Sequence, residues 1–403
     1  MRNRMEMRVK KLHRDRKLYL FYSFFFVIFL GQAAYGAFFP VYLTNAGMPA
    51  GMLGITNGIY QIILFFFIPV IGILADRIFS AKKVLLGLLL ICGLILFVFK
   101  YVRTVPLLAV SMVVFSVFFG STGGIYEALG VDYAIRSGYH YNPIRMAGTI
   151  GYGVMSVILG RLLIDRESLM INIFLLVLAV SFTIGCFLPD IHRIEEEDPS
   201  AKGDQVFLLL KRTDLRSILI LFTIFMLGTS FNSTFFGIHL TRHLGGNYFM
   251  IGIGNALLAA SEFPFHIGPG RRWMKRLGIK RCMVAVMLVG AFRWLIAAVC
   301  SNPWIFTGTM ALNGVMLVPV IVELVEYLHA IAPDGLQTSV QTVLKAGFSM
   351  IGVLAANIIL GQFVQFLNDR GVNGIRYGYA ALLLVYVVAG MVGFRKWVWH
   401  KVE

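Results

Sequence analysis

The sequence predicts an all-α membrane protein with about twelve spanning helices. Hydrophobic residues fill 58% of the 403 positions and charged residues only 14%, whereas a soluble chain carries about 25% charge. The apolar residues gather in runs of about 20, the length that crosses a bilayer as a helix. Lysine and arginine concentrate in alternate breaks between these runs, as they do in chains that cross a membrane repeatedly.

Each apolar run defines one predicted span. The first follows the basic segment Arg2–Lys17, and at 26 positions (18–43) it is too long for the core of a cleavable signal peptide. The predicted spans are 18–43, 51–74, 84–101, 105–130, 141–161, 168–189, 216–240, 248–270, 282–300, 303–329, 337–366 and 377–395.

The longest polar break is 190–215, and it contains Glu195-Glu196-Glu197-Asp198-Pro199. We interpret it as a cytoplasmic linker between an N-terminal six-helix half, 1–189, and a C-terminal six-helix half, 216–403. Most lysines and arginines lie at the N-terminus, at the C-terminus and in the even-numbered breaks, so both termini are expected in the cytoplasm. Anionic lipid headgroups are the expected partners of the net charge of +16, and no nucleic-acid partner is expected.

The sequence shows no pattern typical of an enzyme or an ATP-driven pump. It has no phosphate-binding loop, no HExxH and no nucleophile elbow. Cys92, Cys186, Cys282 and Cys300 lie singly in apolar runs, so neither a disulfide nor a metal site is expected. No cofactor is expected beyond a proton as coupling ion.

The two halves repeat each other. Gly72 begins the basic break after the second span, and Gly268 begins the one after the eighth span. The sequence separation between these glycines equals that between Glu127 in the fourth span and Glu323 in the tenth. A duplicated half with matching polar positions is typical of secondary transporters.

The break Gly72-Ile73-Leu74-Ala75-Asp76-Arg77, followed by Lys82-Lys83, resembles the signature loop of the major facilitator superfamily, although Phe79 replaces its second glycine. Stretches around Tyr126-Glu127, Arg145, Ser261-Glu262 and Arg293-Trp294 resemble the lactose permease and phenylpropionate permease branches. The resemblance implies the major facilitator fold and proton symport. It also implies that Gly72, Asp76 and Arg77 form a gating loop. Span ten departs from lactose permease, with Gly314 and Leu317 at the positions of its histidine and glutamate.

Ionisable side chains inside the spans are expensive to bury and must face the protein interior and pair. They are Glu127, Arg145, Glu262, Arg293, Glu323, Glu326 and Lys345. Two residues at equal sequence distances from the turn between their helices are expected at the same depth in the membrane. This predicts three couples: Glu127 with Arg145, Glu262 with Arg293, and Glu323 with Lys345.

We assign substrate binding to Glu127 and Arg145, because a carboxylate and a guanidinium together accept and donate hydrogen bonds in fixed geometry. Tyr152, two helical turns beyond Arg145, would stack on the substrate. Glu262, Arg293, Glu323, Glu326 and Lys345 are assigned to proton coupling. The competing interpretation is that these couples only hold helices together and that Tyr152 is a packing residue.

We therefore expect a monomeric secondary transporter of a bacterial inner membrane. Its expected activity is proton-coupled symport of a small polar organic solute, such as a sugar, oligosaccharide or nucleoside, by alternating access. The alternatives are aromatic-acid uptake, proton-driven efflux of amphipathic compounds, and a non-transporting membrane receptor or enzyme.

Overall fold

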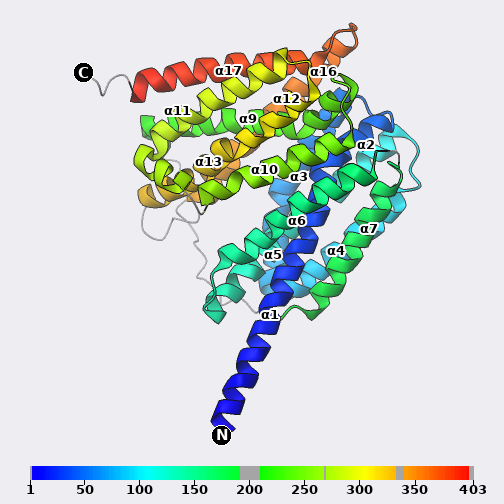
Figure 1. Cartoon of the computed structure of the whole chain (residues 1–403), viewed down its shortest axis with the longest axis vertical. Coiled ribbons are helices and arrows are strands. Elements are labelled where there is room, and N and C mark those ends of the chain that lie inside the picture. The colour runs from blue at the N-terminus through cyan, green and yellow to red at the C-terminus, as the bar shows by residue number, and fades with distance from the viewer. Residues whose placement is uncertain (1, 165, 191–208, 267–268, 333–339, 399–403) are drawn as a thin grey trace. The chain divides into compact units, whose positions relative to one another are not determined.

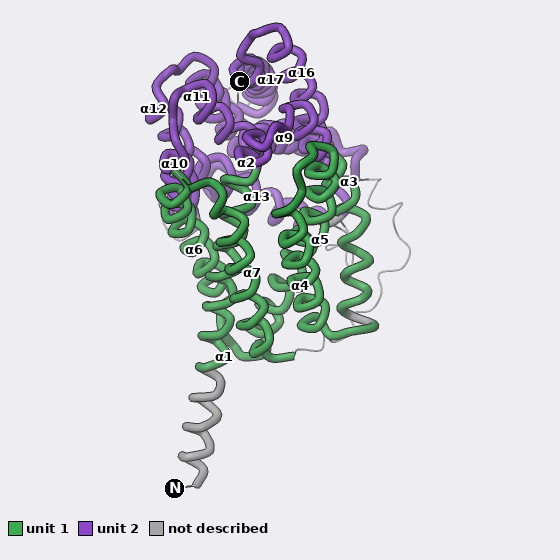
Figure 2. Tube along the Cα trace, turned by 90° about the vertical axis from the view of Figure 1, so that its right-hand side faces the viewer, with its two compact units in different colours: residues 1–39, 59–196 green, residues 40–58, 197–403 purple. Residues whose placement is uncertain are grey.

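The computed structural model describes residues 2–164, 166–190, 209–266, 269–332 and 340–398, and it omits the side chains of 2–15, 76, 77, 266, 269, 341 and 342. Every regular element in these ranges is a helix, which confirms the all-α prediction. The helices form two compact units, Met1–Phe39 with Ile59–Glu196 (unit 1) and Pro40–Gly58 with Glu197–Glu403 (unit 2) (Figure 2). The units are described one at a time below.

The first span is a single helical run of three elements. Helix α1 (Arg2–Ala33) continues into the π-helical η1 (Ala34–Phe38) and then α2 (Phe39–Asn45). Pro40 follows η1 and has no N–H to donate to the carbonyl four residues earlier, so a widened turn at this point avoids a clash with its ring. Since π-helical turns often occur at functional sites, η1 is a candidate position.

Unit 1 also contains the elements that follow the first span along the chain. They are the α3 residues that follow Gly58, from the helix Ala50–Ile73, then η2 (Leu74–Ile78), α4 (Ala81–Phe99), α5 (Val105–Ser137), α6 (Tyr141–Leu162) and α7 (Leu169–Phe187). Helices α6 and α7 both pack on α1, and α4 packs on α5 and α7. Aromatic rings fill the core between α1 and α5, where Tyr126 makes edge contacts with Phe24, Phe25 and Phe29.

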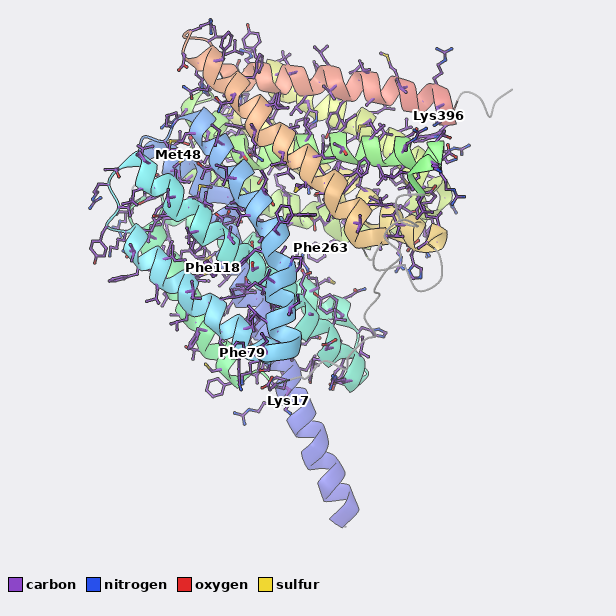
Figure 3. The ribbon with its side chains drawn as sticks, turned by 180° about the vertical axis from the view of Figure 1, so that it is seen from behind. Lys17, Met48, Phe79, Phe118, Phe263 and Lys396 are labelled. Atoms are coloured by element: carbon purple, nitrogen blue, oxygen red, sulfur yellow. The ribbon has the colours of Figure 1, made fainter. Side chains whose placement is uncertain are left out.

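Unit 2 contains α2 from Pro40 onward, the first turns of α3 and the remaining elements. They are η3 (Leu209–Lys211), α9 (Thr213–Arg242), α10 (Tyr248–His266), α11 (Pro269–Val299), α12 (Pro303–Gly308), η4 (Thr309–Leu312), α13 (Asn313–Ile331), η5 (Gln341–Lys345), α15 (Ala346–Leu354), η6 (Ala355–Ile359), α16 (Leu360–Asn368) and α17 (Gly374–Trp397). Helices α9, α11 and α17 lie side by side (Figure 1). Asp214 of α9 joins them at one end, where it pairs with Lys280 of α11 at 2.5 Å and with Lys396 at 3.7 Å. Lys396 lies at the C-terminal end of α17 (Figure 3).

The described residues contain ten helices long and apolar enough to cross a membrane, so the predicted count of twelve is not confirmed. Helices α6 and α10 have the required length but are not among the ten. These two helices contain Arg145, Tyr152 and Glu262, all of which were predicted as functional, and such residues lower the apolar content of a helix.

Two predicted loops are helical. After α3 the chain continues as η2, and only Phe79 and Ser80 separate η2 from α4, whose N-terminus is capped by Ser80 accepting from the Lys83 amide. The basic break predicted before the ninth span forms the first part of α11. Gly278 interrupts this helix, because its backbone has a positive φ of 68°. Both segments were predicted as loops because their basic residues lower the hydropathy. Lysine and arginine nevertheless favour helices, which explains why the segments are helical. Most of the predicted linker lies outside the described residues, but 213–215 already belong to α9.

Candidate functional site

The predicted couple of Glu127 and Arg145 is present in unit 1. Arg145 Nε of α6 lies 3.3 Å from Glu127 Oε1 of α5. The guanidinium carbon of Arg145 also lies 4.5 Å from the ring centroid of Phe29 on α1. The two charged side chains remain 40% and 47% exposed, so the pair satisfies its charges while leaving donor and acceptor atoms accessible to a ligand.

Glycines on α6 bring Arg145 close to α1. A side chain at Gly148 would come within 2.7 Å of the Phe29 ring, and one at Gly151 would overlap the backbone oxygen of Phe26. The glycines after Arg145 therefore allow close contact between α6 and α1, as small residues do in membrane bundles. The close approach of α6 to α1 at these glycines therefore determines where the Arg145 guanidinium lies.

Tyr152 lies on the same helix and is partly exposed. A Cβ at Gly36 in η1 would be 3.9 Å from the Tyr152 hydroxyl oxygen, so the ring points toward the π-helical part of the first span. In the same unit Tyr35 of η1 donates to Ser116 Oγ at 2.8 Å, and Gln61 donates to the Tyr60 hydroxyl at 3.0 Å. Ser116 and Gln61 have neither a charge nor an aromatic ring, so the sequence pattern alone does not distinguish them from other residues of the spans.

The environment of Arg293 differs from the prediction. Its side chain is buried (1% exposed), with Nη2 2.8 Å from Met310 Sδ and the guanidinium carbon 5.0 Å from the Trp294 ring. Arg293 Nε has no hydrogen-bond partner among the described atoms. The contacts described for Arg293 are thus with η4 and α11, and its pairing with Glu262 stays a prediction. Sequence distance from a turn gives depth but not the direction in which a side chain points, so the burial of Arg293 against Met310 and Trp294 was not predicted.

The acids of span ten are one turn apart on α13 but differ in burial. Glu323 is buried (8% exposed), whereas Glu326 is exposed. The charges of Glu326 and of Lys275 on α11 lie near enough to act on the Glu323 carboxylate. Lys345 ends η5, which packs on α13, and its pairing with Glu323 stays a prediction.

Gly314 shows why span ten departs from lactose permease. Its amide donates to Ser261 Oγ at 2.8 Å, and a side chain at this position would overlap the backbone of α10 at Ser261. A histidine therefore cannot replace Gly314 without separating α10 from α13.

The predicted gating residues lie at the end of α3 and in η2. Gly72 is in α3 with open space around it, while Asp76 and Arg77 belong to η2 and their side chains are outside the description. Lys17 and the turn at Phe79 lie toward the same end of unit 1 (Figure 3).

A pocket of about 520 Å³ opens in unit 2 among the α2–α3 turn, the end of α9 and the α16–α17 turn. Met48, Arg242, His243, Gln365 and Asn373 are among its lining residues. Arg242 Nη2 donates to the Thr44 carbonyl at 2.7 Å and to Asn45 Oδ1 at 3.2 Å. Desolvation and, second, the charge of Arg242 lower the pKa of His243, which favours the neutral imidazole. The predicted site residues are not among those that line this pocket, and the described residues contain no cluster of metal ligands.

Comparisons with known proteins agree on one group. The model of the family described as "MFS_1 like family" matches residues 16–370. The chain is 24% identical to the maltose permease of Geobacillus stearothermophilus, over 93% of this chain and 92% of the permease. It is also 24% identical to the putative nucleoside transporter YegT of Escherichia coli K12, over 92% and 93%. The crystal structure of the nucleoside transporter NupG superposes with a TM-score of 0.81 at 16% identity, covering 94% of this chain and 98% of that one.

Proposed function

This chain belongs to the MFS_1 like family, and we propose that it carries a small polar organic solute into the cell in symport with a proton, by alternating access. A secondary transporter of small solutes with the major facilitator fold is what the family, the permease relatives and the NupG structure support. The proposal goes beyond this support in three respects: the proton as coupling ion, transport into the cell, and a polar organic molecule as the solute.

The exposed Glu127–Arg145 couple is the observation that carries the proposal. Such a couple offers fixed acceptors and donors 3.3 Å apart, which suit the vicinal hydroxyls of a sugar or nucleoside. The maltose permease and the putative nucleoside transporter are relatives whose names give solutes of this kind. Glu127, Arg145 and Tyr152 are accordingly proposed to bind substrate, and Glu262, Arg293, Glu323, Glu326 and Lys345 to couple the proton.

The topology belongs to the same proposal. Two six-helix halves, 1–189 and 216–403, joined by a cytoplasmic linker, would form a monomer in the bacterial inner membrane with both termini in the cytoplasm. The concentration of lysine and arginine in alternate breaks supports this orientation.

Uptake into proteoliposomes tests the proposal. Labelled maltose and uridine, each supplied outside vesicles with an alkaline interior, should accumulate above the outside concentration. Addition of a protonophore should abolish this accumulation. Accumulation under the reversed gradient would instead establish antiport, and uptake that never exceeds equilibrium under either gradient would refute proton coupling.

A further inference from the structure

The pocket of unit 2 lies where three segments of the chain meet. The α2–α3 turn, the end of α9 and the α16–α17 turn form its walls, and its volume is about 520 Å³. Pockets of about 300–1,000 Å³ are the usual sites for small organic molecules. The residues proposed to bind substrate or to couple the proton do not line it, so the pocket needs an explanation of its own.

Hydrogen bonds join the walls of the pocket to one another. Arg242 Nη2, at the end of α9, donates to the Thr44 carbonyl of the α2–α3 segment at 2.7 Å. On the other side, the Gly51 amide of α3 donates to Gln365 Oε1 of α16 at 3.2 Å. The three segments are therefore packed together around the pocket.

The helices that form the walls are also joined about two turns further along α3. Asn57 Nδ2 donates to Thr234 Oγ1 of α9 at 3.2 Å and to Asn357 Oδ1 of η6 at 3.4 Å. Between them, a side chain at Gly54 would overlap the backbone oxygen of Asn357, and a Cβ at Gly361 would lie 3.3 Å from the Gly54 Cα. The pocket thus belongs to the packed body of unit 2.

Two asparagines of the lining are left with hydrogen-bond donors only. Asn368 Oδ1 accepts from the Gly374 amide at 2.9 Å, and Asn373 Oδ1 accepts from the Arg376 amide at 3.2 Å. A backbone N–H can only donate, so it fixes which atom of each side-chain amide is the oxygen. The Nδ2 groups, with two N–H donors each, therefore remain for a ligand, and both asparagines line the pocket.

The charge of the lining is positive. Arg242 uses Nη2 for its bonds to the Thr44 carbonyl and Asn45 Oδ1, and the described part of the chain gives its Nε and Nη1 no acceptor. The lining contains no aspartate or glutamate among the described residues. Asp369, which adjoins Asn368 in the chain, is not in the lining and accepts from Gln365 Nε2 at 2.6 Å. A guanidinium with donors to spare, and no acid beside it, favours an anionic ligand.

Apolar side chains complete the lining. They include Met48 (Figure 3), Ile238, Val372 and Ile375. An inorganic ion would leave these side chains unused, whereas an organic anion could cover them with its apolar part.

We propose that this pocket binds a small organic anion, whose carboxylate or phosphate group accepts hydrogen bonds from Arg242, Asn368 and Asn373. The apolar part of the ligand packs against Ile238 and Val372. The site goes beyond the proposed function, because it involves neither the substrate residues nor the proton-coupling residues. The proposed orientation places the three turns outside the cytoplasm, so the ligand reaches the pocket from outside the cell.

Thermal unfolding in detergent tests the site, because a ligand that binds only the folded protein raises its melting temperature. The probes are benzoate and phenyl phosphate at constant ionic strength, with benzamide as the uncharged counterpart of benzoate. At least one of the two anions should raise the melting temperature in a saturable manner, and benzamide should not. Absence of a shift with both anions, or an equal shift with benzamide, would overturn the proposal.

Asn373→Asp distinguishes this pocket from any other place where an anion could bind. Aspartate keeps the oxygen that accepts from the Arg376 amide, but it replaces the Nδ2 donor with a charged oxygen that repels an anion. The anion concentration for the half-maximal shift should rise at least tenfold, and Asn368→Asp should act in the same way. Asn302→Asp is the matched control, since Asn302 caps α12 through its Oδ1 and lies outside the lining.

An unchanged half-maximal concentration in both pocket variants would show that the anion binds elsewhere and would refute the site. The test includes no transport assay. Its failure would leave the proposed function standing, and absence of transport would leave the anion site standing.

Discussion

Arg145 and Glu127 face each other across α6 and α5 at 3.3 Å, and each side chain keeps a large part of its surface accessible. The pair is therefore neither a deeply buried structural ion pair nor a pair fully surrounded by solvent. The ring of Phe29 limits the movement of the guanidinium on one side. This arrangement leads directly to a test of substrate contact.

Arg145→Lys should weaken substrate binding at least tenfold, or about 1.4 kcal/mol. Lysine keeps the positive charge but loses the planar fork that can bind a carboxylate and a hydroxyl together. Half-saturation of solute exchange, measured without a proton gradient, reports the change. Arg161→Lys, on the exposed end of the same helix, is the matched control. Unaltered half-saturation in Arg145→Lys would remove Arg145 from the binding site.

Glu262→Gln should abolish uphill transport driven by a pH gradient and leave solute exchange intact. Glutamine resembles the protonated acid but cannot release the proton. The measurements are accumulation and exchange in the same proteoliposomes.

Glu323→Gln and Glu326→Gln are the comparison variants for this test. Glu323 is buried beside Glu326, and two neighbouring acids disfavour double ionisation, so span ten could hold the proton instead. Accumulation that survives in Glu262→Gln and fails in either of these variants would move the coupling site to α13.

Asp76→Asn should slow turnover and leave equilibrium binding nearly unchanged. Asp76 lies in η2 at the short junction between α3 and α4, where a carboxylate could brace one state of the cycle. The maximal exchange rate and the binding affinity should be measured together. Asp190→Asn, after the end of α7, serves as control, and parallel losses of binding and rate in Asp76→Asn would contradict a gating role.

Gly151→Ala should lower thermal stability in detergent, because the added methyl group would overlap the Phe26 carbonyl of α1. Overpacking of this kind costs about 1–3 kcal/mol. Gly87→Ala in α4 has no atom within 4 Å of the new Cβ and should not lower the melting temperature. Equal melting temperatures for the two variants would show that α6 can move away from α1 without cost.

The sequence was sufficient to predict the family fold, because hydropathy, charge bias and the signature break are properties of the chain read in order. It also gave the Glu127–Arg145 pair, whose members flank a single turn on adjacent antiparallel helices. The same reasoning did not predict the burial of Arg293 against Met310 and Trp294, because equal depth on two helices says nothing about the direction in which their side chains point. The rotation of α11, set by packing among Met310, Trp294 and Tyr379, decides that direction.

Only the tertiary structure brought Asn57, Thr234 and Asn357 together. Each lies within a different predicted span, and the sequence separations between them exceed any local periodicity. A hydrogen bond between such residues depends on which helix faces meet, and the bare backbone at Gly54 and Gly361 decides that here. Sequence alone thus determined the all-α membrane fold and the places in the chain that carry charge, while close packing of the helices decided which polar groups became partners.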